Sequence, residues 1–506
     1  MKRLNINHLW ILCVGIIAIF GLWETLLGLK QLIIWINRGK TLYPMTGSFY
    51  NPGPFGGFIG LILPISLSIL YKARKLNSYL VCCILLGIIL QVFALGLSGS
   101  RAGLMGALVG CFVSLYLSIP NNKGLHKIKS KLRKLNKYSK IVFVLSLAIV
   151  LGGFLICGYK IKKDSADGRL LIWKIATIAL YNNPHGVGWN QVPGAYGEAQ
   201  ESYFASGCGS EKEKMVSGAP RYVFNEFLQI SLAWGIFAGI LFVVIILLAI
   251  YNAVKYRNGA VAGALTSFTI FACASYPLQF EIFRWSLGFL LCAALVLGSS
   301  SRKLSFIYLL LLTCIITGLI YIQQNENKIK LGKEIYDNNI RPLYSNIPNR
   351  IYIDKLMQIT ESSTLTLDSV NVIGCRLKVD ADVLFEYGHA LSNLRYFKES
   401  NEVMKLAMTI SSDPMILNII AKNYHEMGND MKAEEWLRKS INRLPSRIYP
   451  HYLLCQLYYS KLDLYKQKLI NEATFINNMP IKVNSPAVIT MLAEINKMME
   501  NVENYD

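Results

Sequence analysis

The sequence is poor in charge, and its longest apolar runs contain almost none. Only 16% of its 506 residues are charged, whereas 53% are hydrophobic. Several runs exceed the ~18 apolar residues that a helix needs to cross a bilayer. This scarcity of charge excludes an ordinary soluble protein of this size.

Motifs for metals, nucleotides and disulfides are also missing. The chain has no zinc-type Cys/His spacing, no phosphate-binding P-loop and no dinucleotide-binding fingerprint. Of its 11 cysteines, only Cys208, Cys375 and Cys455 lie outside apolar runs, and these allow at most one intramolecular bridge. We therefore expect no metal, no cofactor and no disulfide framework.

Acidic residues are outnumbered by basic ones, which gives a net charge of +21. A charge of this size can indicate nucleic-acid binding. The basic residues, however, fall in short loops beside apolar runs, as the positive-inside rule for membrane proteins describes. The pattern favours contact with membrane lipids and no nucleic-acid partner.

What the sequence has in abundance is apolar runs of helical length. We predict an all-α, polytopic membrane bundle of about nine spans, near residues 9–36, 54–71, 78–97, 101–119, 141–158, 227–250, 259–276, 284–300 and 304–322. The first run is too long for a signal peptide, contains Glu24 and lacks a clear cleavage site, so we interpret it as a retained helix.

Orientation follows from the loop 120–140, which holds eight basic residues and no acid. Such a loop is expected in the cytoplasm. Alternation of the spans then places the N-terminus in the cytoplasm, and the long loop 159–226 and everything after residue 322 on the external face. An enzyme acting there has no ATP, so its substrate must arrive already activated.

The composition becomes polar after residue 322. We divide the chain into a membrane domain at 1–322, a linker or irregular helices at 323–380, and a helical tail at 381–506. With position 1 set at Pro414, the tetratricopeptide pattern, which repeats every ~34 residues, matches at Ala421, Tyr424, Ala433, Leu437 and Pro445. The tail is therefore predicted to form a small helical-hairpin solenoid that binds a protein partner, with an unrelated helical bundle as the alternative.

Two arginines are candidate anion-binding residues. Arg101 stands where an external turn enters a span, beside Ser100 and small glycines that let a bulky anion approach. An arginine at membrane depth is costly unless paired, and its guanidinium suits diphosphate oxygens. Arg169 begins the amphipathic stretch 169–176, which we expect to lie on the membrane surface. Snorkelling at the interface and binding of lipid headgroups are the respective alternatives.

Two residues are candidate general bases. His185 lies on a turn between Pro184 and Gly186, where an imidazole can titrate near neutral pH. Glu226 stands beside Asn225 at the junction of loop and membrane, where partial burial raises the pKa of a carboxyl group. The alternatives are an exposed loop histidine and a helix-start carboxylate favoured by the dipole. Other loop acids, Glu198, Glu201, Glu211 and Glu213, are interpreted as solvated charges.

Five segments in this order resemble the O-antigen ligase and polymerase superfamily of bacterial inner-membrane glycosyltransferases. They are Phe49-x-Asn51-Pro52-Gly53-Pro54-Phe55, Ser98-Gly99-Ser100-Arg101-Ala102-Gly103, Gly168-Arg169-x3-Trp173, Asn183-Pro184-x-Gly186-Val187-Gly188 and Asn225-Glu226-Phe227-Leu228-Gln229. The resemblance covers about residues 20–300, and a tetratricopeptide-like tail accompanies some members.

The resemblance implies that residues 1–322 transfer a glycan from undecaprenyl diphosphate to an acceptor hydroxyl on the periplasmic face, with inversion and without metal. Arg101 and Arg169 would hold the diphosphate, with Asn51, Ser100 and Asn225 in support. Ligases usually carry a histidine where this chain has Phe224. Glu226 or His185 would have to act as the base instead, or the reaction would rely on positioning without a base.

The acceptor stays open at this point. Transfer to lipid A core makes the chain a ligase, whereas transfer to a growing polysaccharide or to a protein makes it a polymerase or a protein O-oligosaccharyltransferase. A different class is a non-catalytic membrane scaffold whose tail recruits periplasmic partners. A transporter is disfavoured, because the sequence shows no paired discontinuous helices and few charges within its spans.

Overall fold

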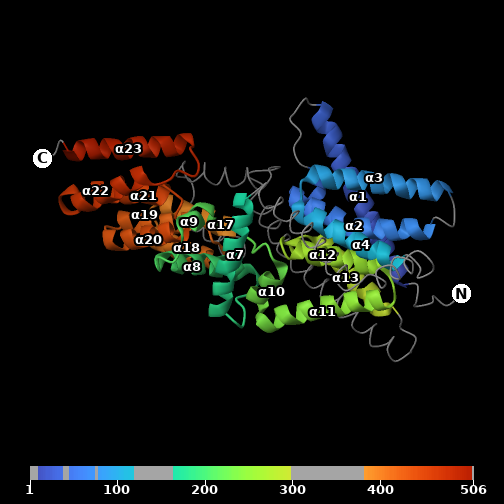
Figure 1. Cartoon of the computed structure of the whole chain (residues 1–506). Coiled ribbons are helices and arrows are strands. Elements are labelled where there is room, and N and C mark those ends of the chain that lie inside the picture. Colours follow the sequence, from blue (N-terminus) through green and yellow to red (C-terminus); the bar gives the residue numbers. More distant parts are fainter. Residues whose placement is uncertain (1–8, 38–44, 74–77, 119–162, 298–380, 504–506) are drawn as a thin grey trace, which may run out of the picture. The chain divides into compact units, whose positions relative to one another are not determined.

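The computed structural model describes residues 9–37, 45–73, 78–118, 163–297 and 381–503, which are the coloured parts of Figure 1. Within these ranges the regular structure is entirely helical, which confirms the all-α prediction. The predicted spans 141–158 and 304–322, the basic loop 120–140 and the linker 323–380 lie outside the described residues. The chain divides into two compact units, which we describe separately.

The first unit holds the membrane helices. They are α1 (Leu9–Asn37), α2 (Pro52–Ala73), α3 (Ser78–Ser98), α4 (Arg101–Ser118), α11 (Ile236–Lys255), α12 (Gly259–Ala272) and α13 (Glu281–Val296), with short 3-10 turns η2 (Gly47–Phe49) and η4 (Pro277–Gln279). Five of the described helices, α1 to α4 and α11, are long and apolar enough to cross a bilayer. The chain is therefore an integral membrane protein.

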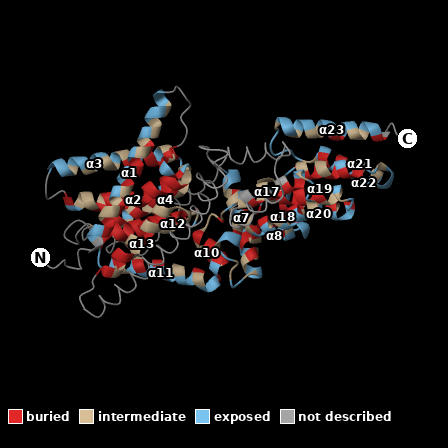
Figure 2. Cartoon of the chain, turned by 180° about the vertical axis from the view of Figure 1, so that it is seen from behind, coloured by how far each residue is buried: buried red, intermediate tan, exposed pale blue. Residues whose placement is uncertain are grey.

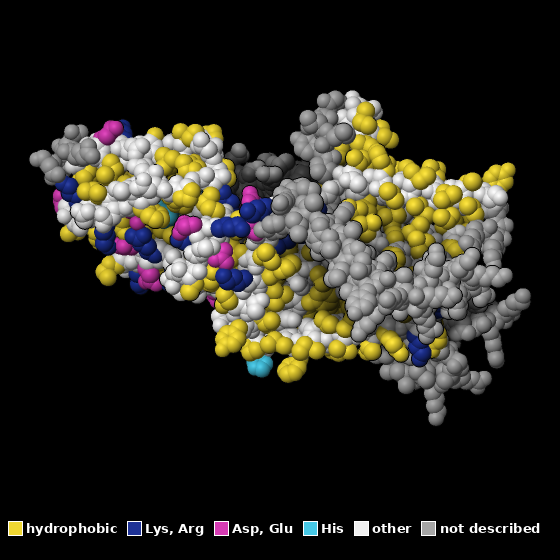
Figure 3. Space-filling view, in the orientation of Figure 1, with side chains coloured by type: hydrophobic (Ala, Val, Ile, Leu, Met, Phe, Trp, Pro, Cys, Tyr) yellow, Lys and Arg dark blue, Asp and Glu magenta, His cyan; other side chains and the backbone are white. Residues whose placement is uncertain are grey.

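The core of this unit is formed by α2, α4 and α12, which pack on one another. Figure 2 shows buried residues concentrated there, whereas α3 and α11 are largely exposed. Small residues permit the contact: a Cβ atom on Gly103 would lie 2.5 Å from the carbonyl oxygen of Gly56. The exposed side chains of α3 and α11 are mostly hydrophobic, as a lipid-facing surface requires (Figure 3).

One predicted span is interrupted. The sequence predicted a single helix over 227–250, but the structure has α10 (Glu226–Trp234) and then α11, separated by Gly235. Gly235 has φ +94°, a conformation that ends a helix and is strained for any residue with a side chain. Its Cβ would also meet the carbonyl oxygen of His185 at 2.9 Å. The break is therefore built into both the sequence and the packing.

The second unit contains two parts of the chain: the segment between the predicted spans 141–158 and 227–250, and the C-terminal tail. The predicted loop 159–226 contains α7 (Lys163–Asn182), α8 (Val192–Ala205) and α9 (Glu211–Val216), with the 3-10 turn η3 (Trp189–Gln191). Leu171, Ile175, Ala176 and Ala179 on the apolar side of α7 pack in a core with residues of α8 and α10. Protein therefore covers this side of residues 169–176, and their expected position on the membrane surface stays a prediction.

The tail packs as consecutive helix pairs. The pairs are α17 (Ala381–Asn393) with α18 (Phe397–Ile410), α19 (Met415–Glu426) with α20 (Asp430–Arg443), and α21 (Tyr449–Tyr459) with α22 (Leu462–Asn478), followed by α23 (Pro486–Glu503). Ala421, Ala433 and Leu437 are buried between them. The tetratricopeptide assignment itself stays a prediction.

Helix α8 joins the inter-span segment to the tail by packing on α18 and α20. The guanidinium of Arg443, which is 1% exposed, donates to the carboxylate of Glu201 at 2.9 Å. The side-chain amide of Gln200 also donates to the carbonyl of Arg443. The interpretation of Glu201 as a solvated charge is wrong, since its partner comes from a helix more than 200 residues later, which the sequence does not place beside it.

Candidate functional site

The segment that precedes Asn51 is held by polar side chains of α1. The carboxylate of Glu24, which is 2% exposed, accepts hydrogen bonds from the backbone N–H of Ser48 at 3.0 Å and from its hydroxyl at 2.7 Å. Two turns later, Gln31 accepts from the N–H of Gly47 at 3.1 Å and donates to its carbonyl at 2.9 Å. Buried polar groups in a membrane span are costly unless satisfied, so this clamp fixes the segment rigidly.

Asn51 and Ser100 bind opposite ends of Gly53. The Oδ1 atom of Asn51 accepts from the N–H of Gly53 at 2.9 Å, and the hydroxyl of Ser100 donates to the carbonyl of Gly53 at 2.9 Å. Ser100 also caps α4, because its Oγ accepts from the N–H of Gly103 at 3.2 Å. Arg101, half-buried, is the first residue of this capped helix. Through Gly53, these bonds connect the start of α2 to the start of α4, where Arg101 lies.

Asn51 reaches the connection between α12 and α13 as well. Its amide nitrogen donates to the hydroxyl of Tyr276 at 2.9 Å. The Phe224 ring meets the Tyr276 ring edge-on, with centroids 5.0 Å apart. Phe224 has φ +56°, which is unusual for a bulky residue and is characteristic of functional or strained positions. The position where ligases carry a histidine is thus occupied by a strained residue in contact with Tyr276.

Glu226 is the first residue of α10 and is completely buried. Its Oε1 atom accepts from the N–H of Leu278 at 2.6 Å, while Arg284 donates to the carbonyl of the same residue at 2.9 Å. Glu226 lies outside the candidate spans, and burial raises its pKa to about 8, although the Leu278 N–H and the charge of Arg284 oppose this. A carboxyl group of this pKa can exchange a proton near neutral pH.

The first unit therefore brings five of the seven predicted site residues, Asn51, Ser100, Arg101, Asn225 and Glu226, into the turns that lead into α2, α4 and α10. A chain of contacts runs from Ser100 through Gly53 and Asn51 to Tyr276 and Phe224. The remaining two, Arg169 and His185, belong to the second unit.

In the second unit, Arg169 is half-buried on α7, and His185 is exposed on the turn that follows this helix. The turn has no room for larger residues: Gly186 has φ +90°, and a Cβ atom there would lie 2.6 Å from the backbone nitrogen of Gly235. The Asn-Pro-His-Gly-Val-Gly motif is thus explained by close backbone packing against the end of α10. It presents the His185 side chain outward.

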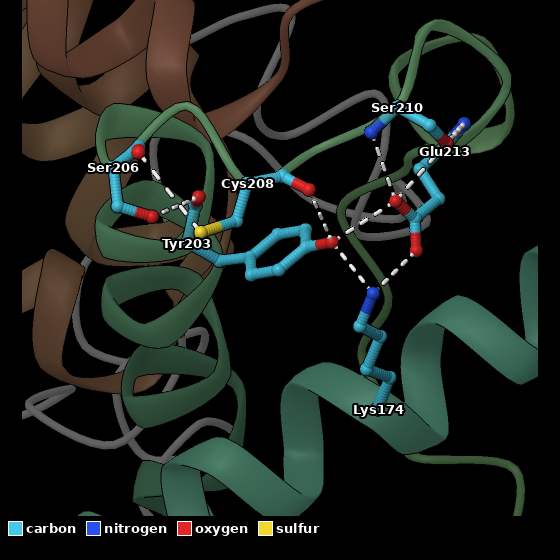
Figure 4. Close-up of polar contacts among 6 residues, drawn as sticks. All are labelled: Lys174, Tyr203, Ser206, Cys208, Ser210 and Glu213. Atoms are coloured by element: carbon cyan, nitrogen blue, oxygen red, sulfur yellow. Dashed lines mark hydrogen bonds and ion pairs between the residues drawn. The ribbon is translucent and has the colours of Figure 1, made fainter.

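A polar network ties α7 to the segment between α8 and α9 (Figure 4). The ammonium of Lys174 lies 2.7 Å from the Glu213 carboxylate and donates to the Tyr203 hydroxyl at 2.6 Å. The Tyr203 hydroxyl donates to Glu213 at 2.9 Å, and Ser210 caps α9 in a capping box with Glu213. Burial alone would raise the pKa of Glu213, but bonds from Lys174, Ser210 and Tyr203 lower it to about 2. The interpretation of Glu213 as a solvated charge is therefore wrong.

Sequence reasoning missed three residues of this arrangement. Tyr276 lies in the connection of α12 and α13, Arg284 lies in the first turn of α13, and Glu24 was noted only as a charge in the first run. Arginine and glutamate at the ends of or within apolar runs could have indicated them. Among the described residues, no group of three or more His, Cys, Asp or Glu side chains is placed to hold a metal ion.

The fold and these turns define a polytopic membrane protein with polar residues fixed where its helices begin. Within this class, the family model described as O-antigen ligase matches residues 86–243, a stretch that includes Arg101, Arg169, His185 and Glu226. This match supports the O-antigen ligase and polymerase superfamily, which the sequence motifs predicted. No curated protein and no solved structure matches the chain. The family supports a ligase- or polymerase-like function, a glycosyltransferase-like enzyme and a lipid-linked glycan as donor.

Proposed function

We propose that the protein is a ligase-type transferase that moves a glycan from undecaprenyl diphosphate to a hydroxyl group of lipid A core at the periplasmic face of the bacterial inner membrane. The acceptor oxygen attacks the anomeric carbon and the bond to the diphosphate oxygen breaks, with inversion. The acceptor proton passes to a base of the protein, and undecaprenyl diphosphate leaves.

Arg101 carries this proposal. It starts α4, whose first turn directs backbone N–H groups and the positive end of the helix dipole toward an anion. Ser100 fixes the turn by its bonds to Gly53 and Gly103. A guanidinium forms a bidentate pair with phosphate oxygens, which stabilises the charge that develops on the leaving group. Arg169 is the proposed second ligand of the same diphosphate.

Glu226 and His185 are the proposed bases. The pKa of about 8 favours Glu226, and its Oε2 atom has no hydrogen-bond partner among the described residues, but the carboxyl group is completely buried and must become accessible to the acceptor hydroxyl in order to act. His185 is exposed and accessible without such a change. Asn51 and Asn225 would orient the acceptor or the sugar, with Tyr276 holding the Asn51 amide.

The test is a deletion strain complemented with variants and analysed for lipopolysaccharide ladders and glycoproteins together. Arg101→Ala should abolish transfer at normal protein level. Arg101→Lys should lose at least tenfold, since an ammonium lacks the guanidinium fork. The matched control is Arg257→Lys, which alters an arginine of the same unit that bonds to the carbonyls of Tyr116 and Leu117 and should leave transfer unchanged.

The products of the deletion strain separate the acceptors. Accumulated full-length lipid-linked chains indicate a ligase, caps of a single unit indicate a polymerase, and selective loss of glycoproteins indicates a protein O-oligosaccharyltransferase. An unchanged glycan profile in both the deletion strain and Arg101→Ala would contradict an enzymatic function and leave the membrane scaffold with a protein-binding tail.

A further inference from the structure

The turn between α7 and η3 is fastened to the junction of α10 and α11. Three backbone hydrogen bonds of 2.8 to 3.1 Å join the two segments: Val187 to Leu232, Gly188 to Ala233, and Ile236 to Pro184. Gly186 and Gly235 leave no space between the two backbones. The turn therefore stays at the start of α11.

That junction lies where a membrane span begins. Helix α11 starts at Ile236 and is apolar and long enough to cross a bilayer. Trp234 precedes it by two residues and is separated from it by Gly235 alone. Phe237, in the first turn of α11, is 84% exposed, as expected of a side chain in contact with lipid. Because Trp234 directly precedes a candidate span, we expect it at the depth where hydrocarbon gives way to headgroups.

Aromatic side chains gather at this depth. The Trp189 ring stacks on the Trp234 ring with centroids 5.1 Å apart, yet Trp234 remains 55% exposed. Tyr181, at the end of α7, is 85% exposed. Indole and phenol rings are amphipathic and are enriched at the boundary between lipid and water.

We propose that Tyr181, Trp189 and Trp234 form a membrane-interface anchor that docks the second unit on the phospholipid headgroup layer. The occupant of this surface is the bilayer itself, and the proposal does not depend on glycan transfer. The anchor fixes the end of α7 at the membrane. Arg169 precedes Tyr181 by 12 residues on this helix, which is about 18 Å along its axis.

The test places nitroxide labels on the full-length protein in vesicles of phosphatidylethanolamine and phosphatidylglycerol. The labels are attached at Tyr181→Cys and His185→Cys, with native cysteines replaced, and their collision rates with oxygen and with a water-soluble nickel chelate are measured. The control is Met431→Cys on α20, which is 82% exposed in the same unit. We expect the ratio of oxygen to nickel accessibility to be several-fold higher at 181 and 185 than at 431. Equal ratios, or low accessibility to both reagents as under a protein partner, would overturn the proposal.

A second measurement uses the native cysteines. Bromine-labelled phospholipids quench indole fluorescence only at short range, so vesicles containing them should quench Trp189 and Trp234. The quenched fraction should fall in the variant Trp189→Phe, Trp234→Phe relative to the control Trp436→Phe on α20. A fall no larger than in the control would contradict the anchor even where the cysteine-replaced protein fails to fold.

Discussion

The side-chain amide of Asn51 donates a hydrogen bond to the hydroxyl of Tyr276 at 2.9 Å, across 225 residues of sequence. This contact joins the turn that leads into α2 with the connection between α12 and α13. The same Asn51 binds Gly53, which Ser100 binds from the start of α4. Three separate parts of the membrane domain are thereby held together beside Arg101.

Removal of the Tyr276 hydroxyl tests this link. Tyr276→Phe deletes one neutral hydrogen bond, worth about 1 kcal/mol, so we expect transfer to fall about fivefold with little change in protein level. Asn51→Ala breaks this bond and the bond to the Gly53 N–H, so its effect should be smaller in the Tyr276→Phe background than in the wild type. Tyr251→Phe on the exposed side of α11 is the control. Additive losses in the double variant would show that the two residues act separately.

Glu226→Gln tests the proposed base. The amide oxygen can still accept the Leu278 N–H, whereas the proton-accepting carboxylate is lost. Transfer should therefore fall by about 10²- to 10⁴-fold while the fold is retained. If Glu226→Gln remains active and only Glu226→Ala fails, Glu226 holds the Leu278 turn, and the base must be sought at His185.

The same variant has a predicted pH dependence of stability. The pKa of Glu226 is raised to about 8 in the folded protein, so the folded state binds the proton more tightly than the unfolded state. Its contribution to the free energy of unfolding is full below the ordinary pKa of about 4.5 and declines as pH rises toward 8. Thermal unfolding in detergent should be less sensitive to pH in Glu226→Gln over this range. An identical slope in both proteins would contradict the raised pKa.

The contribution of Glu213 to stability depends on pH in the opposite direction. Its pKa is lowered to about 2, so its bonds to Lys174 and Tyr203 stabilise the folded protein above the ordinary pKa of about 4.5 and are lost as pH falls toward 2. Hydrogen exchange of α9 should therefore accelerate over this acidic range in the wild type. Glu213→Gln should remove this dependence, and Glu211→Gln, at a more exposed acid of the same helix, should not.

Arg443 should be the residue on which the attachment of α8 to the tail depends most. Loss of one partner of a buried ion pair costs about 3–5 kcal/mol, so Arg443→Ala should expose α8 and α20 to limited proteolysis. Lys439→Ala is the matched control, because it removes an exposed pair with Glu435 on the same helix, worth 0 to ~1 kcal/mol. Equal protease resistance of the two variants would contradict the importance of the bond between Arg443 and Glu201.

Local patterns predicted the helices but not their partners. The apolar runs foretold α1 to α4 closely, because a bilayer imposes a minimum length on each span. The division at Gly235 was missed, since one glycine in an apolar run does not by itself indicate a break. The folding of residues 163–216 was also missed, because α8 is stabilised by Arg443 and other tail residues that lie far away in sequence.

Some residues of the candidate site could be predicted from local motifs, and others could not. The motifs identified Asn51, Ser100, Arg101 and Glu226, all of which lie in turns at helix starts. Tyr276 and Arg284 follow no motif: tertiary packing brings Tyr276 to Asn51, 225 residues away, whereas Arg284 bonds to Leu278 only six residues before it. A charged residue beside an apolar run can be noticed in the sequence, but the tertiary partner of a side chain such as Tyr276 cannot.

We propose that Arg101 and Arg169 hold one diphosphate. The direct test is the affinity of the purified protein for undecaprenyl diphosphate in the wild type, Arg101→Ala, Arg169→Ala and the double variant, with Arg447→Ala on the tail as control. A charged hydrogen bond contributes about 1.5–3 kcal/mol, so each single variant should bind at least about tenfold more weakly. The double variant should lose less than the product of the two single losses, because the ligand is shared. Affinity unchanged by either substitution, or losses that multiply fully, would contradict a shared diphosphate site.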